Sequence, residues 1–270
     1  MFGSGSRRAG VVIGSHSTVH WFFLQSPPAD GATNMAIDHA LMHRARVSGD
    51  AVLRIYAWAS PVLSLGRNQL ARGRYDGPAL AAAGVDVVRR PTGGRALLHD
   101  REVTYSVTQP VVDGERLGEA YARINLLIVD VLRSLGIPAT VAQRSGPARA
   151  PGMLPCFAEP ARGEIVVGDR KLAGSAQWRD GSVLLQHGSI LLDNDQGSIA
   201  DFMVERPPEV PTPATLRGEL GRFIEVPEIA EVFHDRLRLS YDLVETLAPD
   251  SVGVHDFLAT YRDPSWTWRR

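Results

Sequence analysis

The single cysteine and the single lysine of the chain are the residues whose chemistry is most distinctive. Cys156 is the one cysteine, and among 29 basic residues only Lys171 is a lysine. A thiolate is a strong nucleophile, and a nearby ammonium group stabilises it. Cys156 follows a Pro-, Gly- and Arg-rich stretch, a setting untypical of a cysteine that only fills a core. We predict a cysteine nucleophile with the Lys171 ammonium within about 6 Å. Without Cys156 as its partner, Lys171 would be interpreted as an exposed residue on a surface strand.

A second candidate is the segment RRPTGGRALLHD, in which a strand end meets a Gly-Gly turn. Backbone N–H groups and guanidinium groups in such a turn can surround a carbonyl, phosphate or carboxylate group. The segment lacks the GxGxxG spacing and the Gly-Lys-Ser/Thr ending of the common nucleotide-binding loops. The alternative interpretation is a tight β-turn with exposed arginines.

Three residues of the run NMAIDHALMHRARV could also do chemistry. His39 and His43 have the i, i+4 spacing of a zinc pair, but HALMH lacks the adjacent glutamate of the protease motif. We therefore expect no metal there and a solvated helix face shared with Arg46. Asp38 lies on the apolar side, where a carboxylate needs a hydrogen-bond donor or a cation. We expect it to contact a neighbouring loop.

Composition limits the function classes open to the chain. Its 270 residues are 44% hydrophobic and 22% charged, which is typical of a globular protein. A formal net charge of -1 gives no bulk attraction to nucleic acid or to an anionic membrane. We find no apolar stretch long enough to span a bilayer and no signal peptide, and one cysteine cannot form an internal disulfide. We expect a cytoplasmic protein.

Hydrophobic patterning predicts the elements that position these residues. We expect a disordered lead-in over 1–19 and one domain over 20–262, with a helical tail from about 215. A helix is predicted from Thr33 or Asn34 to Ser48, and a longer helix over 115–135. The other predicted elements are a pair of strands over 52–58 and 61–66, a short helix over 79–84, a strand over 85–90 and a half-buried strand over 102–108.

Residues 163–192 give the clearest pattern, a three-strand antiparallel meander. Its turns are predicted at Gly168-Asp169 and at Asp180-Gly181. We expect the meander to lie in the principal sheet, with the helix over 115–135 packed on one face of the domain.

The second meander strand carries Lys171. The two-residue period places Lys171, Ala173, Ser175 and Gln177 on one face. A two-residue hairpin at Asp180-Gly181 sets Ala173 opposite Gly188, and Ser175 opposite Gln186. The small side chains of the first pair would leave a slot, which suits an acyl chain with a polar head.

Taken together, these segments resemble the superfamily of lipoate/biotin protein ligases and octanoyltransferases. The matching segments, over roughly residues 30–195, are NMAIDHAL, LSLGRNQ, RRPTGGRALLHDREVTYSV, CF, GDRKLAGSAQ and LLQHGSILLD. Within that superfamily the chain is most similar to the cysteine-dependent octanoyltransferases. The resemblance implies an α/β fold of the biotin/lipoate protein ligase catalytic-domain type, with a mixed sheet flanked by helices.

The resemblance also implies a two-step acyl transfer without a metal or a cofactor. Cys156, activated by Lys171, would take the octanoyl group from octanoyl-acyl carrier protein as a thioester. A lysine of a lipoyl-domain protein, such as the glycine cleavage system H protein or a 2-oxoacid dehydrogenase E2 subunit, would then accept it. His99 would carry a proton or anchor a loop. The residues implied to bind substrate are Arg90, Thr92, Gly93, Gly94, His99, Gly174, Ser175 and Ala176.

Two alternatives remain open. An ATP-dependent lipoate-protein ligase activates a free acid as its adenylate and needs no cysteine, but such ligases usually carry a third glycine where this chain has Arg95. Many of them also have an accessory C-terminal domain, for which little chain remains after Asp195. The second alternative is a non-catalytic module that binds acyl carriers.

Overall fold

The protein is built around a mixed sheet of eight strands. Its structure, a computed structural model, describes residues 19–143, 156–157, 160–194, 196–206 and 211–270. The strand order is β11-β1-β2-β6-β10-β9-β8-β7, with β11, β1 and β2 parallel and the other pairs antiparallel. In chain order these strands are β1 (Trp21–Gln25), β2 (Ala51–Tyr56), β6 (Glu102–Pro110), β7 (Thr140–Val141), β8 (Ile165–Val167), β9 (Arg170–Asp180), β10 (Val183–Leu191) and β11 (Val244–Thr246).

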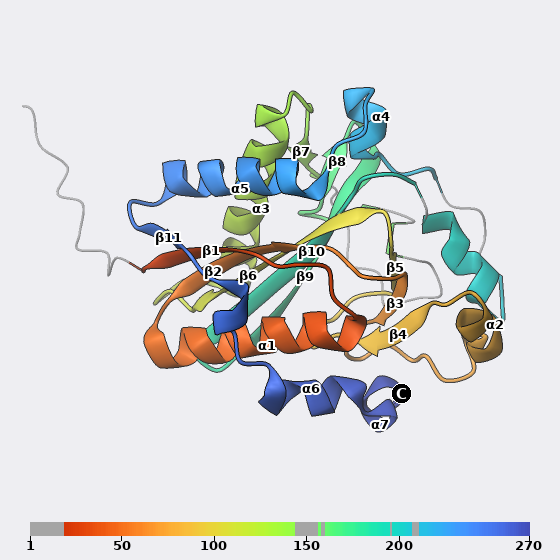
Figure 1. The fold of residues 1–270 in the computed structure, drawn as a ribbon. Coiled ribbons are helices and arrows are strands. Elements are labelled where there is room, and N and C mark those ends of the chain that lie inside the picture. The colour runs from red at the N-terminus through yellow and green to blue at the C-terminus, as the bar shows by residue number, and fades with distance from the viewer. Residues whose placement is uncertain (1–18, 144–155, 158–159, 195, 207–210) are drawn as a thin grey trace, which may run out of the picture.

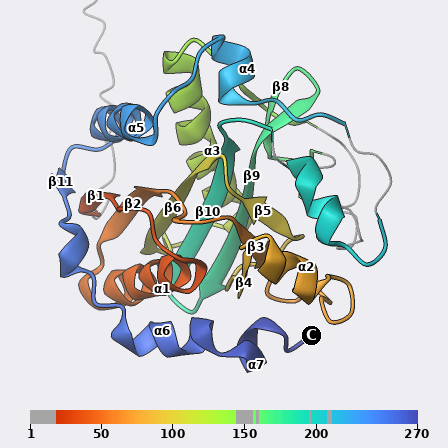
Figure 2. The ribbon, with the colours of Figure 1, turned by 45° about the vertical axis from the view of Figure 1, so that its right-hand side comes forward.

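A smaller sheet, of order β4-β3-β5, lies beside the large one (Figures 1 and 2). It consists of β3 (Val62–Leu65), β4 (Asp86–Arg89) and β5 (Leu97–His99). The predicted pairing of 52–58 with 61–66 is wrong, because β2 has β1 and β6 on its two edges and β3 pairs in the smaller sheet. The predicted strand over 85–90 is confirmed as β4.

Helices cover both faces of the large sheet. In Figure 1, α1 lies below the sheet with α6 beneath it, and α3 and α5 lie above. The predicted helix over 115–135 is confirmed as α3, and the short helix over 79–84 is found at 77–82. The α-helices are α1 (Gly31–Ser48), α2 (Gly77–Ala82), α3 (Leu117–Ser134), α4 (Leu216–Leu220), α5 (Val226–Ser240), α6 (His255–Arg262) and α7 (Pro264–Thr267), and two short 3-10 helices span Gln196–Phe202 and Pro249–Ser251.

Helix α1 begins earlier than predicted and is more covered. Its N-cap is Asp30, whose carboxylate accepts the Thr33 N–H, rather than Thr33 or Asn34. It ends as predicted at Ser48, before Gly49 in the left-handed conformation. The predicted solvated face is only partly correct: His43 is exposed, but α6 packs against His39.

Strand β6 is buried along eight of its nine positions rather than half-buried. The reason is its place inside the sheet, between β2 and β10, with α3 and α5 over one face and α1 over the other.

The meander is confirmed as β8, β9 and β10 in the large sheet, with its first turn at Gly168-Asp169. The second turn differs, because Val183 pairs with Asp180 and the loop is therefore residues 181–182. Gly181 has a φ of 59°, a left-handed conformation that suits glycine in a two-residue hairpin.

This shift changes the predicted partners across the hairpin. Ser175 lies opposite Gly188, and Ala173 lies opposite Ile190. The ring of Tyr105 and the hydroxyl of Ser175 lie 2.7 and 2.8 Å from where a Cβ on Gly188 would stand. They fill the space over Gly188, so the predicted slot between Ala173 and Gly188 is wrong.

A bulge in β9 changes which way Lys171 faces. Ile165 pairs with Ala173 and Val166 with Lys171, which leaves Leu172 as an extra residue. Leu172 and Ala173 both join the core beneath α3. Lys171 therefore lies on the other face of the sheet, and its predicted alignment with Ala173 is wrong.

Part of the predicted organisation lies outside the described residues. This holds for residues 1–18 of the expected lead-in and for the loop over 144–155 that precedes Cys156. The single domain over 20–262 stays a prediction. None of the helices within the described ranges is long and apolar enough to cross a membrane.

Candidate active site

The structure brings Cys156 and Lys171 together as predicted. The Lys171 Nζ lies 3.5 Å from the Cys156 Sγ and donates to the Cys156 carbonyl oxygen at 2.7 Å. Lys171 is 2% exposed, whereas Cys156 is half-buried. The predicted limit of about 6 Å between the two groups is confirmed, and their catalytic roles stay predictions.

Glu164, which the sequence analysis did not identify, is the third member of this site. Its Oε1 lies 2.7 Å from the Lys171 Nζ, and its Oε2 accepts the Ala161 N–H. Burial alone would lower the pKa of Lys171, but the charges of Cys156 and Glu164 outweigh burial and raise it. Lys171 is thus held as an ammonium group, and all three of its N–H donors are used.

Gly174 has no side chain, and the Lys171 and Cys156 side chains occupy the space beside it. A Cβ at this position would lie 2.9 Å from the Lys171 Cε, 3.0 Å from its Nζ and 3.5 Å from the Cys156 Sγ. Because of the bulge at Leu172, Lys171 and Gly174 lie on the same face of β9, and the Lys171 ammonium is therefore next to the Cys156 sulfur. Gly174 therefore lies beside the cysteine and the lysine, and its predicted role in substrate binding stays a prediction.

Ser175 and Ala176 have different surroundings. Ser175 faces α3, where its hydroxyl lies 2.6 Å from the Tyr105 hydroxyl, so the structure does not bring it to the cysteine. Ala176 pairs with His187 across the β9–β10 hairpin. Their roles in substrate binding stay predictions.

The Arg90–Arg95 turn is fixed by its first residue. The Arg90 guanidinium donates to the oxygens of Ser64 and to the carbonyls of Gly93 and Arg95, which uses all five of its N–H donors. Arg90 therefore positions the turn, while its predicted contact with substrate stays untested. The next carbonyl, of Ala96, accepts the Cys156 N–H and ties the cysteine to this turn.

Gly93 and Gly94 present the open side of the turn. Gly94 has a φ of 97°, a conformation that favours glycine. Within the described residues, the backbone N–H groups of Gly93 and Gly94 form no hydrogen bond. These two N–H groups could therefore donate to a carbonyl oxygen, and the predicted contact of Gly93 and Gly94 with substrate stays a prediction.

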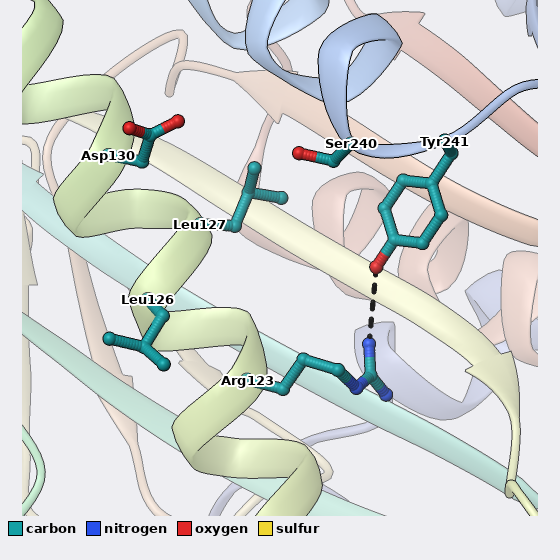
Figure 3. Close-up of a pocket in the computed structure, with 6 residues that line it drawn as sticks. All are labelled: Arg123, Leu126, Leu127, Asp130, Ser240 and Tyr241. Carbon is teal, nitrogen blue, oxygen red and sulfur yellow. Dashed lines mark hydrogen bonds between the residues drawn. The ribbon is translucent and has the colours of Figure 1, made fainter. Parts of the chain in front are cut away.

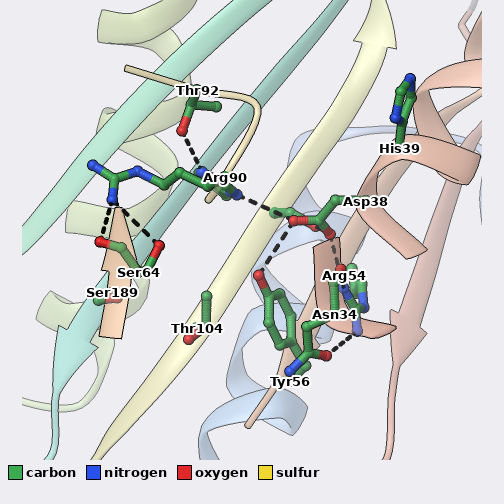
Figure 4. Close-up of polar contacts among 12 residues, drawn as sticks. Asn34, Asp38, His39, Arg54, Tyr56, Ser64, Arg90, Thr92, Thr104 and Ser189 are labelled. Atoms are coloured by element: carbon green, nitrogen blue, oxygen red, sulfur yellow. Dashed lines mark hydrogen bonds and ion pairs between the residues drawn. The ribbon is translucent and has the colours of Figure 1, made fainter. Parts of the chain in front are cut away.

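A buried polar chain supports Thr92. Its Oγ1 lies 2.6 Å from the His187 Nε2, and the His187 Nδ1 lies 3.1 Å from an Asp38 oxygen. Asp38 in turn accepts from Arg54 at 2.8 Å (Figure 4) and from Ser106 at 2.7 Å. The predicted loop contact of Asp38 is therefore wrong, because its partners lie on strands β2, β6 and β10.

Burial and neighbouring charges together determine the protonation of Asp38 and His187. Burial would raise the pKa of Asp38, but Arg54 and His187 lower it further than burial raises it. Burial lowers the pKa of His187, against the opposing effect of Asp38. A neutral His187 can donate from Nδ1 to Asp38 and accept the Thr92 hydroxyl proton at Nε2. Thr92 is fully buried, and its contact with His187 holds the turn against the large sheet.

His99 is bound to a second buried carboxylate. Its Nδ1 lies 2.6 Å from the Glu102 Oε1, and its ring stacks on Trp58 with 4.0 Å between ring centroids. The predicted role as a loop anchor fits these contacts. Sequence reasoning missed Glu102 and His187, and it identified Asp38 without its partners, which lie on strands distant in the chain.

A pocket of about 300 Å³ lies elsewhere, beside α3 and the end of α5, and contains none of the predicted site residues (Figure 3). The pocket is lined by Arg123, Leu126, Leu127, Asp130, Ser240 and Tyr241.

Within the described ranges, no group of three or more His, Cys, Asp and Glu side chains could hold a metal ion.

Comparison with known proteins gives concordant matches. The family of the lipoyl protein ligase A/B catalytic domain matches residues 30–238. Octanoyltransferase LipM of Kyrpidia tusciae is 36% identical over 274 residues, spanning 93% of this chain and 99% of that protein. Octanoyltransferase LipM of Carboxydothermus hydrogenoformans is 42% identical over 180 residues, 65% of this chain and 66% of that protein.

A solved structure shows the same fold. It is a bipartite lipoate protein ligase with its E2 lipoyl domain from Thermoplasma acidophilum, with a TM-score of 0.72 at 19% identity, covering 94% of this chain and 97% of that chain. At this identity the likeness concerns the fold alone, and it confirms the predicted ligase-type mixed sheet flanked by helices.

Proposed function

Because the chain belongs to the lipoyl protein ligase A/B catalytic domain family and is an octanoyltransferase of lipoate biosynthesis, we propose that it carries the octanoyl group on Cys156. The observation that supports this step best is the 3.5 Å contact between the Lys171 ammonium and the Cys156 sulfur. A cysteine with a buried, ion-paired lysine beside it is arranged for nucleophilic catalysis.

The proposal names a donor and an acceptor. The family match supports an acyl donor and a lipoyl-domain acceptor as the kinds of partner. We take the donor to be octanoyl-acyl carrier protein, and the acceptor to be a lysine of the glycine cleavage system H protein or of a 2-oxoacid dehydrogenase E2 subunit. The cytoplasmic location predicted from the sequence stays a prediction.

In the first half-reaction the Cys156 thiolate attacks the thioester carbonyl of the donor. A tetrahedral oxyanion forms, and the N–H groups of Gly93 and Gly94 are the donors that would stabilise it. The C–S bond to the donor then breaks, and Lys171 gives a proton to the departing thiolate. Glu164 keeps the lysine oriented toward the sulfur throughout.

In the second half-reaction the acceptor amine attacks the Cys156 thioester. A C–N bond forms, the C–S bond to Cys156 breaks, and the amide is released. Splitting one transfer in this way replaces a single difficult encounter of two proteins by two simpler exchanges.

The alternative of an ATP-dependent ligase gives the cysteine no task, because an adenylate forms without a protein thioester. A non-catalytic module would leave the cysteine and the lysine without a use.

Intact-mass measurement distinguishes the three functions. Wild-type protein mixed with octanoyl-acyl carrier protein, without ATP, should gain one octanoyl group, and the Cys156→Ala variant should gain none. An adduct on the alanine variant, or ATP-dependent acceptor loading by that variant at the wild-type rate, would overturn the cysteine proposal.

A further inference from the structure

We propose that His99, supported by Glu102, is the base that removes a proton from the acceptor ammonium group in the second half-reaction. This inference rests on the proposed Cys156 thioester and adds the residue that makes the incoming amine nucleophilic. The resemblance implied that His99 carries a proton or anchors a loop, and this inference assigns it one proton of one step, with Glu102 as its supporting charge.

The chemistry requires such a base. A lysine side chain is a cation at neutral pH and must lose one proton before it can attack and a second before the amide is neutral. Lys171, after giving its proton to the donor thiolate, can take back only one. The other proton needs a different acceptor.

The ring of His99 is set up to accept that proton. The His99 Nδ1 lies 2.6 Å from the Glu102 Oε1, and in the neutral tautomer that donates from Nδ1 to this oxygen the lone pair is on Nε2. In the described part of the chain, His99 Nε2 forms no hydrogen bond. Stacking on Trp58 fixes the ring plane, and the Trp58 Nε1 is itself held by Thr104.

Two independent contacts place His99 on the same face as the cysteine. Gly174, whose Cβ position is 3.5 Å from the Cys156 sulfur, pairs directly with Ser189 on β10. Side chains paired in this way lie about 5 Å apart. The Ser189 hydroxyl is 3.3 Å from the His99 Nδ1, so the histidine follows directly after Ser189 on this face.

The second contact comes through β5. Leu97 packs in one apolar cluster with Phe157 and Leu191, and Cys156 packs against this cluster. His99 is two residues farther along the strand and therefore points to the same side, about 7 Å along. His99 and the cluster that contacts Cys156 therefore lie on one side of β5, where we place the acceptor amine.

Glu102 supplies the charge that His99 needs when it becomes an imidazolium. Its carboxylate is 2% exposed, and its Oε1 accepts from His99, Thr104 and Ser189. Its Oε2 is buried without a hydrogen-bond partner. Within the described residues, its one ion-pair partner is His99. A buried carboxylate whose ion-pair partner is His99 stabilises a positive charge on the His99 ring.

The protons balance over the complete cycle. His99 takes the first proton of the acceptor ammonium, and the free amine forms its C–N bond to the thioester carbon. Lys171 takes the second proton as the Cys156 thiolate leaves, which restores the original ion pair. His99 then releases its proton to solvent, so one thioester and one ammonium give one amide, one thiol and one proton.

The test separates the half-reactions in His99→Gln and Glu102→Gln. The second variant keeps an oxygen for the three donors and removes only the negative charge. Acyl-enzyme formation from octanoyl-acyl carrier protein, followed by intact mass, should stay within about threefold of wild type in both variants. Transfer from the isolated acyl-enzyme to the acceptor lysine should fall about a hundredfold in His99→Gln and less in Glu102→Gln.

Hydroxylamine supplies the control reaction, because it is unprotonated at neutral pH and needs no base. It should cleave the acyl-enzymes of wild type and variants at similar rates, and the exposed His43→Gln should behave as wild type in both assays. Wild-type transfer to lysine by either His99→Gln or Glu102→Gln would overturn the inference, as would equal losses with hydroxylamine and lysine. Absence of an adduct on wild type would instead reject the thioester proposal itself.

Discussion

One methyl group added at Gly174 should separate the Lys171 ammonium from the Cys156 sulfur. A Cβ there would stand 2.9 Å from the Lys171 Cε, too close for both to remain, and the flexible end of the lysine is what can move. If Nζ moves from 3.5 Å to about 5 Å from the sulfur, the Coulomb attraction falls by about 1.4 kcal/mol at an effective dielectric constant of 20. That difference corresponds to a factor of about ten in the electrostatic stabilisation of a negative charge on the sulfur.

Alkylation by iodoacetamide measures this loss directly, because Cys156 is the only thiol in the chain. The rate at neutral pH should fall about tenfold in Gly174→Ala. Gly118→Ala is the matched control, since a Cβ at Gly118 meets nothing within 4 Å and should leave the rate unchanged. An unchanged rate in Gly174→Ala would refute the reasoning that Lys171 stabilises the thiolate across this gap.

Three further changes probe the surroundings of the site. Lys171→Arg should lower the rate of acyl-enzyme formation by about a hundredfold, because a planar guanidinium cannot replace a buried point charge; stopped-time mass spectra that match wild type would contradict this. Glu164→Gln should lower the free energy of unfolding by about 3 kcal/mol in urea titrations, since it leaves a buried ammonium without its counter-ion; a loss below about 0.5 kcal/mol would show that the ion pair contributes little. Burial lowers the pKa of His187, so the unfolded chain binds a proton first as the pH falls below about 6.5, and stability should drop by up to about 1.4 kcal/mol per pH unit there; His187→Gln should flatten this slope, and an identical slope would be inconsistent with a neutral buried histidine.

Local patterns in the sequence predicted much of the scaffold. The long apolar period of α3, the alternation in the meander and the Gly168-Asp169 turn all arise from residues near one another in the chain, where period and turn chemistry act directly. The meeting of Cys156 and Lys171 was also predictable, because a nucleophilic thiolate needs a cation and the chain has one lysine.

The errors concern features that no local pattern encodes. The bulge at Leu172 reverses the facing of Lys171, and a period of two cannot show where an extra residue is inserted. The hairpin register depended on whether Asp180 or Ser182 joins the loop, and either choice gives a two-residue turn.

The charged partners of the buried acids were missed for a related reason. Glu164, Glu102 and Asp38 are three acidic residues among 30 Asp and Glu residues, and only the assembled sheet shows that each is buried beside a specific base. The one available signal was the apolar surroundings of each acid in its own element, which predicts a need for a partner without naming it.

The most direct test of octanoyl transfer through a Cys156 thioester is a chase of the isolated acyl-enzyme. The octanoylated protein, purified free of donor and ATP, is mixed with a lipoyl-domain acceptor, and both proteins are weighed over time. We expect the octanoyl group to leave Cys156 and to appear, mole for mole, on one lysine of the acceptor. An acyl-enzyme that keeps its octanoyl group, while the complete mixture of donor, enzyme and acceptor still forms product, would contradict a transfer through this cysteine.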